Sequence, residues 1–270
     1  MGDRDGRCSR PRPGAPRAHP ARRRRRHPRR RVAGAAPAHA GSYQCNLRYY
    51  YNYDGSPAWP SSQVNDPSQH EYASCSDAPA IARYDGGTII AAHYQTIVGY
   101  VATYVNPDGA PNWTLSDTYG GAFVAVGPPA VIPYSGGTEL TVPVYNRLGY
   151  FWKPVGSTLQ GPEFPASSGI SQNAPAIART STATDIAATG TDNSLWFYWN
   201  IDGTPNWGSH QIVGPSLAYG TPAIVADDNS TEVAYIAPDA SLWFSGSSTA
   251  RRPGTSRRSP GHQPSRAEWR

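Results

Sequence analysis

The chain has 270 residues, enough for one large domain or two small ones, and glycine and proline together occupy 54 of its positions. Because both residues interrupt helices, this composition excludes a mainly helical protein, and no apolar run reaches the roughly 18 residues of a membrane span. The net charge of +5 hides two opposite regions, since residues 1–40 and 251–270 hold 19 of the 24 basic residues while residues 41–250 carry a net charge of −11.

The first 40 residues contain ARRRRRHPRRR and no hydrophobic pattern. Three interpretations stay open: a disordered segment rich in Arg, Pro and Ala, a damaged export signal, or a basic arm for nucleic acid. The segment ends in Ala38-His39-Ala40, the small-residue pattern of a signal cleavage site. Clustered arginines neutralise phosphates, but the aromatic or polar residues that usually accompany such arms are missing. We expect a disordered leader at 1–40, a folded domain at 41–246 and a disordered basic tail at 247–270, with no specific nucleic-acid partner.

The chain has three cysteines, of which Cys8 lies in the leader. Cys45 and Cys75 lie near the start of the folded region, where such a pair in an exported protein is a candidate disulfide. Two unlinked thiols are the alternative. Because there is no CxxC motif and no Cys/His spacing typical of zinc, we expect neither a metal nor a cofactor.

Two short segments recur along the chain with one period. The aromatic segments are LRYYY at Leu47, VATYV at Val101, LGYFW at Leu148, LWFYW at Leu195 and LWFSG at Leu242, spaced by 54, 47, 47 and 47 residues. The Pro-Ala segments are PAIAR at Pro79, PAVIP at Pro129, PAIAR at Pro175 and PAIVA at Pro222, spaced by 50, 46 and 47 residues. Two independent markers with the same spacing indicate a repeat architecture.

One period contains four predicted strands. The Pro-Ala strand is followed by a turn, a second strand such as TDIAATG, the aromatic strand, an Asp-Gly turn and a fourth strand that begins near a tryptophan. Four strands in about 47 residues are typical of one blade of a β-propeller. We therefore predict an all-β fold, a β-propeller of four-stranded antiparallel blades with about four recognisable blades. Because the aromatic strand occurs five times and the Pro-Ala strand four times, we expect an incomplete ring cut from a longer repeat array.

The segment LWFYW predicts a strand with two buried faces. Side chains alternate along a strand, so Leu195, Phe197 and Trp199 point one way and Trp196 and Tyr198 the other. A sheet with one face in water would alternate apolar with polar residues, whereas a propeller blade lies between two neighbours. We expect most of these aromatic side chains to belong to the core.

The stretch PAIARTSTATDIAATGTDNSLWFYWNIDGTPNW, residues 175–207, resembles the repeats of propeller lectins related to the Photorhabdus lectin, and the 47-residue period resembles the tachylectin type. The resemblance covers about residues 43–246. It implies a secreted, sugar-binding, fucose-lectin-like propeller whose sites combine aromatic rings with hydrogen-bonding groups. The segment LGYFWKPVGSTLQGPEF departs from the pattern, because it lacks both the Asp-Gly turn and the tryptophan that follows it.

Sugar binding requires a flat aromatic ring and amide or carboxylate groups for the hydroxyls. Both types recur at matching positions after the aromatic strand. The candidate ligand-binding residues are Asp54 and Trp59, then Asp108, Asn112 and Trp113, then Asp202, Asn206 and Trp207. A structural role stays open for each, because Asp-Gly forms hairpin turns and tryptophan can cover the edge of a blade.

The sequence indicates no catalytic constellation. Ionisable residues outside the repeat phase are scattered, and none lies in a motif such as GxSxG or HExxH. We therefore predict no catalytic residues and no enzymatic activity. The favoured function is multivalent binding of glycans outside the cell, without membrane insertion. The alternative is a non-catalytic protein-interaction module, such as an accessory part of a secreted enzyme, since one fold serves many functions.

Overall fold

The computed structural model describes residues 45–248 except 53–58, 67–74, 76, 85, 96–98, 109, 111, 120–122, 203, 205 and 228–229. The predicted leader, the tail beyond residue 248 and Asp54 therefore lie outside the described residues. Among the residues that are described, no helix is long and apolar enough to cross a bilayer.

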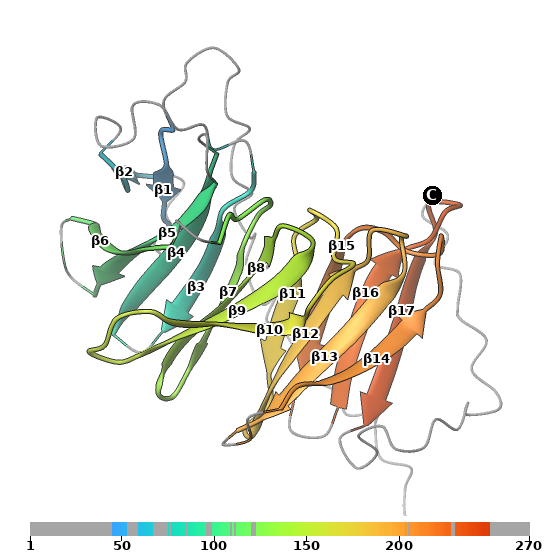
Figure 1. Cartoon of the computed structure of the whole chain (residues 1–270). Coiled ribbons are helices and arrows are strands. Elements are labelled where there is room, and N and C mark those ends of the chain that lie inside the picture. The colour runs from blue at the N-terminus through green and yellow to red at the C-terminus, as the bar shows by residue number, and fades with distance from the viewer. Residues whose placement is uncertain are drawn as a thin grey trace, which may run out of the picture. The chain divides into compact units, whose positions relative to one another are not determined.

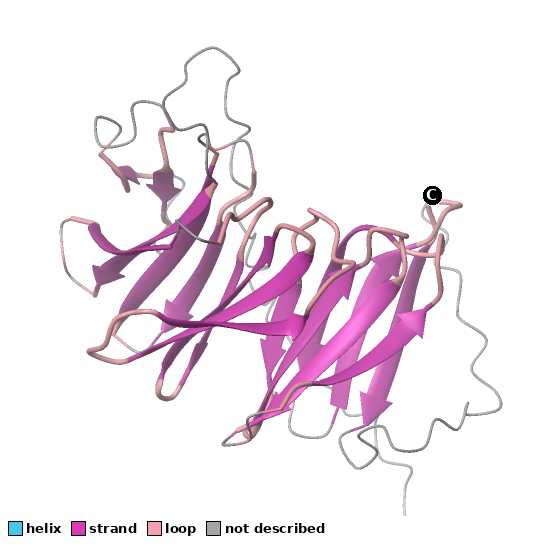
Figure 2. Ribbon diagram, viewed as in Figure 1, coloured by secondary structure: helices cyan, strands magenta, loops and turns pink. Residues whose placement is uncertain are grey.

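The described residues form five antiparallel sheets in which strands adjacent in sequence pair with each other (Figure 1). Strands and loops account for all of this part of the chain (Figure 2). We number the sheets I to V in chain order. Sheet I has β1 (Arg48–Tyr50) and β2 (Ser61–Gln63); sheet II has β3 (Ala80–Tyr84), β4 (Gly87–Tyr94), β5 (Tyr100–Pro107) and β6 (Thr114–Tyr119); sheet III has β7 (Ala130–Tyr134), β8 (Gly137–Val144), β9 (Arg147–Pro154) and β10 (Gln160–Ala166); sheet IV has β11 (Ala176–Arg179), β12 (Ala183–Thr189), β13 (Leu195–Ile201) and β14 (Gly208–Val213); sheet V has β15 (Tyr219–Ala226), β16 (Ser230–Ile236) and β17 (Leu242–Ser248).

The hydrophobic core consists of layers between successive sheets. Leu47 and Val64 from the region of sheet I pack with Ile90 of sheet II, and Ile89 of sheet II packs with Leu140 of sheet III. Sheets III and IV, and sheets IV and V, share clusters of the same kind. Strands β4, β8 and β12 are buried along their whole length because each lies between two such layers.

The aromatic strand β13 shows how the sequence produces this layering. Trp196 and Tyr198 belong to the cluster with sheet III, while Leu195 and Phe197 belong to the cluster with sheet V. The predicted alternation is confirmed for these four residues. Removing apolar area from water on both faces stabilises the stack of sheets, by roughly 1.5–3 kcal/mol for each large side chain.

A disulfide joins the segment before β1 to the segment before β3. Cys45 and Cys75 are bonded, with their Cα atoms 5.2 Å apart. Cys45 is buried in the cluster between sheets I and II, and Cys75 packs against that cluster.

Candidate functional site

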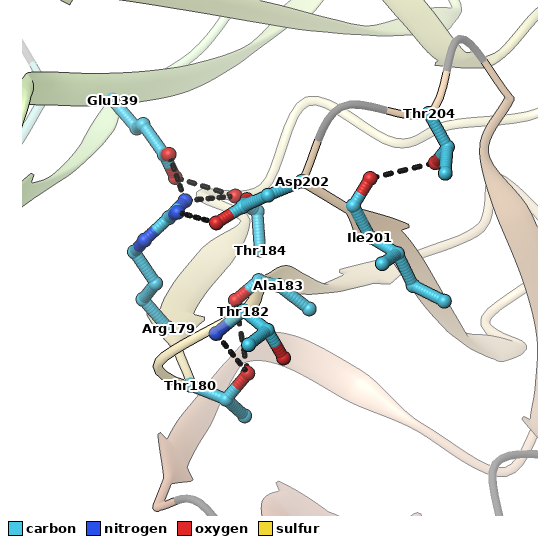
Figure 3. Close-up of polar contacts among 9 residues, drawn as sticks. All are labelled: Glu139, Arg179, Thr180, Thr182, Ala183, Thr184, Ile201, Asp202 and Thr204. Atoms are coloured by element: carbon cyan, nitrogen blue, oxygen red, sulfur yellow. Dashed lines mark hydrogen bonds and ion pairs between the residues drawn. The ribbon is translucent and has the colours of Figure 1, made fainter.

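Arg179 and Asp202 lie at the same end of sheet IV. Arg179 is the last residue of β11, and Asp202 directly follows β13; since neighbouring strands are antiparallel, both strands end at this edge. The amide of Asp202 donates to the carbonyl of Thr182 at 2.9 Å, which ties the end of β13 to the β11–β12 turn. Arg179 Nη2 donates to Asp202 Oδ2 at 2.5 Å (Figure 3).

A carboxylate from the neighbouring sheet completes this arrangement. Glu139 of β8 in sheet III is 3% exposed as a side chain and accepts a hydrogen bond from Arg179 Nη1. Thr184 of β12 donates its hydroxyl to Glu139 Oε2 at 2.7 Å and accepts from Arg179 Nη1 at 2.8 Å (Figure 3). These four residues, Glu139, Arg179, Thr184 and Asp202, are called the Arg179 cluster below.

The two carboxylates of the Arg179 cluster have different surroundings. Burial raises the pKa of Glu139, against the opposing effects of the Thr184 hydrogen bond and the Arg179 charge. Asp202 keeps 45% of its side chain exposed, while Arg179 keeps 16%. The arrangement thus holds a guanidinium between one enclosed carboxylate and one that solvent reaches.

Aromatic rings lie around the Arg179 cluster. The guanidinium carbon of Arg179 is 4.9 Å from the ring centroid of Tyr134. Burial raises the pKa of Tyr150, and the nearby charge of Glu139 raises it further. The Tyr150 ring meets the ring of Trp207 edge-on with 4.8 Å between centroids. Trp207 Nε1 donates to Glu163 Oε2 at 2.8 Å, which links sheet IV to sheet III a second time.

Sheet II repeats most of this arrangement. Arg83 Nη2 donates to Asp108 Oδ2 at 2.7 Å, and Arg83 Nη1 donates to the Thr88 hydroxyl at 3.1 Å. We call Arg83, Thr88 and Asp108 the Arg83 cluster. Its two charged side chains are 64% and 49% exposed, and no described carboxylate stands where Glu139 stands in the Arg179 cluster.

Trp113 in sheet II corresponds to Trp207 in sheet IV. Its ring meets Tyr49 edge-on at 5.1 Å, and its Nε1 donates to Ser62 Oγ at 3.0 Å. Both tryptophans are therefore partly buried against the preceding sheet, with the indole N–H bound to a protein acceptor.

The other predicted site residues lie at the surface. Asn112 and Asn206 are exposed, and their main-chain carbonyls accept from Asn106 Nδ2 at 2.9 Å and Asn200 Nδ2 at 3.2 Å. Trp59 is 47% exposed. Asp108 and Asp202 each accept a hydrogen bond from an arginine in addition to lying at a turn. Asp202 and Trp207 both lie at the interface between sheets III and IV.

Arg83, Arg179, Glu139 and Thr184 were missed by the sequence reasoning. A signal existed for the arginines, because both close the segment PAIAR at the same position of the repeat. A signal existed for Glu139 as well, because a threonine followed by a carboxylate recurs at 138–139, 184–185 and 231–232. Its contact with Arg179, which spans 40 residues, depends on how two sheets pack.

The described surface also has a pocket of about 330 Å³ at the other end of sheet III. It is lined by Phe123, Val144, Tyr145, Asn146 and Arg147 around the β8–β9 turn. The lining is mainly apolar and does not include the charged residues above. Among the described residues, no group of three His, Cys, Asp or Glu side chains is placed to hold a metal ion.

No family model and no curated protein matches the sequence. Several solved structures do match the fold. The BP39L lectin from Burkholderia pseudomallei is 17% identical with a TM-score of 0.54, covering 66% of this chain and 54% of its own. The Aleuria aurantia lectin, a six-bladed β-propeller with a fucose recognition mode, is 17% identical with a TM-score of 0.51, covering 74% of this chain and 69% of its own. AofleA from Arthrobotrys oligospora is 10% identical with a TM-score of 0.50, covering 75% and 61%.

This chain spans about half of the length of the BP39L lectin. At these identities the likeness concerns the fold. The chain has the fold of the β-propeller lectins, as the repeat pattern predicted.

Proposed function

We propose that this chain binds carbohydrate at the Arg179 cluster, and that each four-stranded sheet is one blade of a β-propeller. The observation that carries the proposal is a guanidinium held between a buried and a half-exposed carboxylate, with aromatic rings beside it, where two sheets meet. Sites for small ligands typically combine apolar walls with a few convergent polar groups.

The chemistry of this cluster suits a sugar. A guanidinium only donates hydrogen bonds and a carboxylate only accepts them, whereas a sugar hydroxyl does both. Arg179 and Asp202 therefore offer complementary partners for neighbouring hydroxyls, and both reach solvent. Tyr134 and Trp207 provide aromatic surface for the apolar face of a pyranose.

Fucose is the first ligand to test, because the Aleuria aurantia lectin, which has the same fold, recognises it. We also propose that binding takes place outside the cell and involves no catalysis. The Cys45–Cys75 disulfide supports the location, since such bonds persist in oxidising compartments.

A glycan array with the intact chain, followed by calorimetric titration of the best ligand, tests the proposal. Asp202→Ala should weaken binding about tenfold or more, the usual loss for one hydrogen bond to a charged group. Asp108→Ala is the matched control, because Asp108 holds the same place in the Arg83 cluster, and it should retain most of the affinity. Circular dichroism of each variant verifies folding.

Two results would count against the proposal. A folded wild-type chain that binds no glycan would favour the protein-interaction alternative. Equal losses for Asp202→Ala and Asp108→Ala would remove the Arg179 cluster from its place as the principal site.

A further inference from the structure

Sheet V has an uncovered face. Strand β12 of sheet IV is buried along its whole length, whereas the corresponding strand β16 of sheet V alternates buried and exposed residues. The exposed positions include Glu232 and Ile236, the latter 47% exposed, and Val225 of β15 is 62% exposed. Apolar side chains of this kind are the ones that pack against the next sheet elsewhere in the chain.

In sheet II, strand β3 is uncovered on the face that packs against the preceding sheet in sheets III, IV and V. Ile81 of β3 is 54% exposed, whereas Ile177, which holds the same place in the second PAIAR segment, is 8% exposed because sheet III covers it. Sheet I contributes only the third and fourth strand positions of the repeat, so the two inner positions in front of β3 are not occupied by described residues.

The interfaces between sheets III, IV and V share a polar contact. Glu139 of sheet III accepts from Thr184 of sheet IV at 2.7 Å, and Asp185 of sheet IV accepts from Thr231 of sheet V at 2.6 Å. In sheet IV the carboxylate of Asp185 directly follows Thr184, the threonine that contacts sheet III. Glu139 of sheet III directly follows Thr138 in the same way. Glu232 follows Thr231 in the same way, so it is the next carboxylate in the series, and it lies on the uncovered face.

The Arg83 cluster offers a matching hydrogen-bond donor, the Arg83 guanidinium, for such a carboxylate. Arg83 and Thr88 have the arrangement of Arg179 and Thr184, including the hydrogen bond from guanidinium to hydroxyl. In sheet IV this arrangement receives Glu139, and the Arg179 side chain is then 16% exposed. In sheet II the Arg83 side chain is 64% exposed.

We propose that sheet V of one copy of this chain docks on sheet II of a second copy, with Glu232 bound to Arg83 of that copy. The exposed face of β15 and β16, with Val225 and Ile236, then lies against Ile81 of β3 in the second copy. In its charged part the contact repeats the pairing of Glu139 with Arg179 between sheets III and IV.

A second copy is the partner we infer because sheets I and V of one chain are separate in the structure. They form different sheets, and the hydrophobic clusters that include them share no residue. The contact joins two different surfaces of identical chains, so each copy retains one surface of each kind. Repetition of such a contact produces a closed ring or a filament.

Charge exchange tests the contact and identifies the partner. Arg83→Glu and Glu232→Arg, each measured by sedimentation of the full chain, should weaken self-association at least about tenfold, because like charges then meet at the interface. His210→Arg adds a positive charge at another exposed strand position, on β14, and should leave self-association unchanged.

Mixing the two single variants is the decisive step. Between copies, the glutamate introduced at position 83 of one variant would meet the arginine introduced at position 232 of the other. The remaining Arg83 would meet the remaining Glu232, so the mixture should recover the wild-type association. Contact between sheets II and V of one chain could not be recovered by mixing, and a mixture that stays monomeric would overturn the proposal. A wild-type chain that sediments as a monomer at all concentrations tested would overturn it as well.

Discussion

The same five residues, PAIAR, lie at the start of sheets II and IV, with each proline just before the first strand, but the surroundings of that segment differ. In sheet IV, Ile177 is 8% exposed and Arg179 reaches a buried carboxylate of sheet III. In sheet II, Ile81 is 54% exposed and Arg83 pairs with a half-exposed aspartate. The local sequence determines the strand and the arginine–aspartate pair, while the preceding sheet determines what these residues contribute to stability.

The largest expected contrast is between the two arginines. Arg179→Ala removes the charged partner of Glu139 inside the protein, and breaking such a buried pair typically costs about 3–5 kcal/mol. Arg83→Ala breaks an exposed pair, which contributes about 0–1 kcal/mol. Urea denaturation of both variants measures the difference in the free energy of unfolding. Similar losses of unfolding free energy in both variants would mean that the preceding sheet does not determine how much the arginine of PAIAR contributes to stability.

The two isoleucines provide a second contrast, without charge. Ile177→Ala opens a cavity in the cluster between sheets III and IV and should lower the free energy of unfolding by about 2–5 kcal/mol. Ile81→Ala at dilute protein should change it by less than about 0.5 kcal/mol, because an exposed side chain leaves no cavity. The melting temperatures of both variants test this contrast. A comparable decrease in melting temperature for both would contradict the prediction.

The smallest effect is a change in pH dependence. Burial raises the pKa of Glu139 in the folded chain above its ordinary value of 4.5, so the folded state retains this proton to higher pH than the unfolded state does. Stability from this group is therefore full below pH 4.5 and decreases as the pH rises through the folded-state pKa. In Glu139→Gln this decrease should be absent. Unfolding midpoints measured in steps from about pH 4 upward test it, and identical pH profiles for wild type and variant would contradict it.

The sequence predicted the fold because the repeat is a local pattern. Strands of period two with a recurring 47-residue spacing determined which residues of LWFYW face each neighbouring sheet, and this was confirmed for Leu195 through Tyr198. The candidate site was predictable only in part. Asp202 was predicted and belongs to the Arg179 cluster, and Trp207 was predicted and packs on Tyr150. The contact between Glu139 and Arg179 could not be predicted, because it depends on packing between two sheets.

The Cys45–Cys75 bond has a consequence for the part of the chain that it joins. It closes a loop with a sequence separation of 30, and closing such a loop is worth about 3–4 kcal/mol in the chain-entropy account. The two three-residue strands of sheet I form a hairpin too short to persist by itself. A thiol reductant should therefore release this first hairpin before it affects the four-stranded sheets, so that the redox state of the surroundings determines whether sheet II keeps its cover.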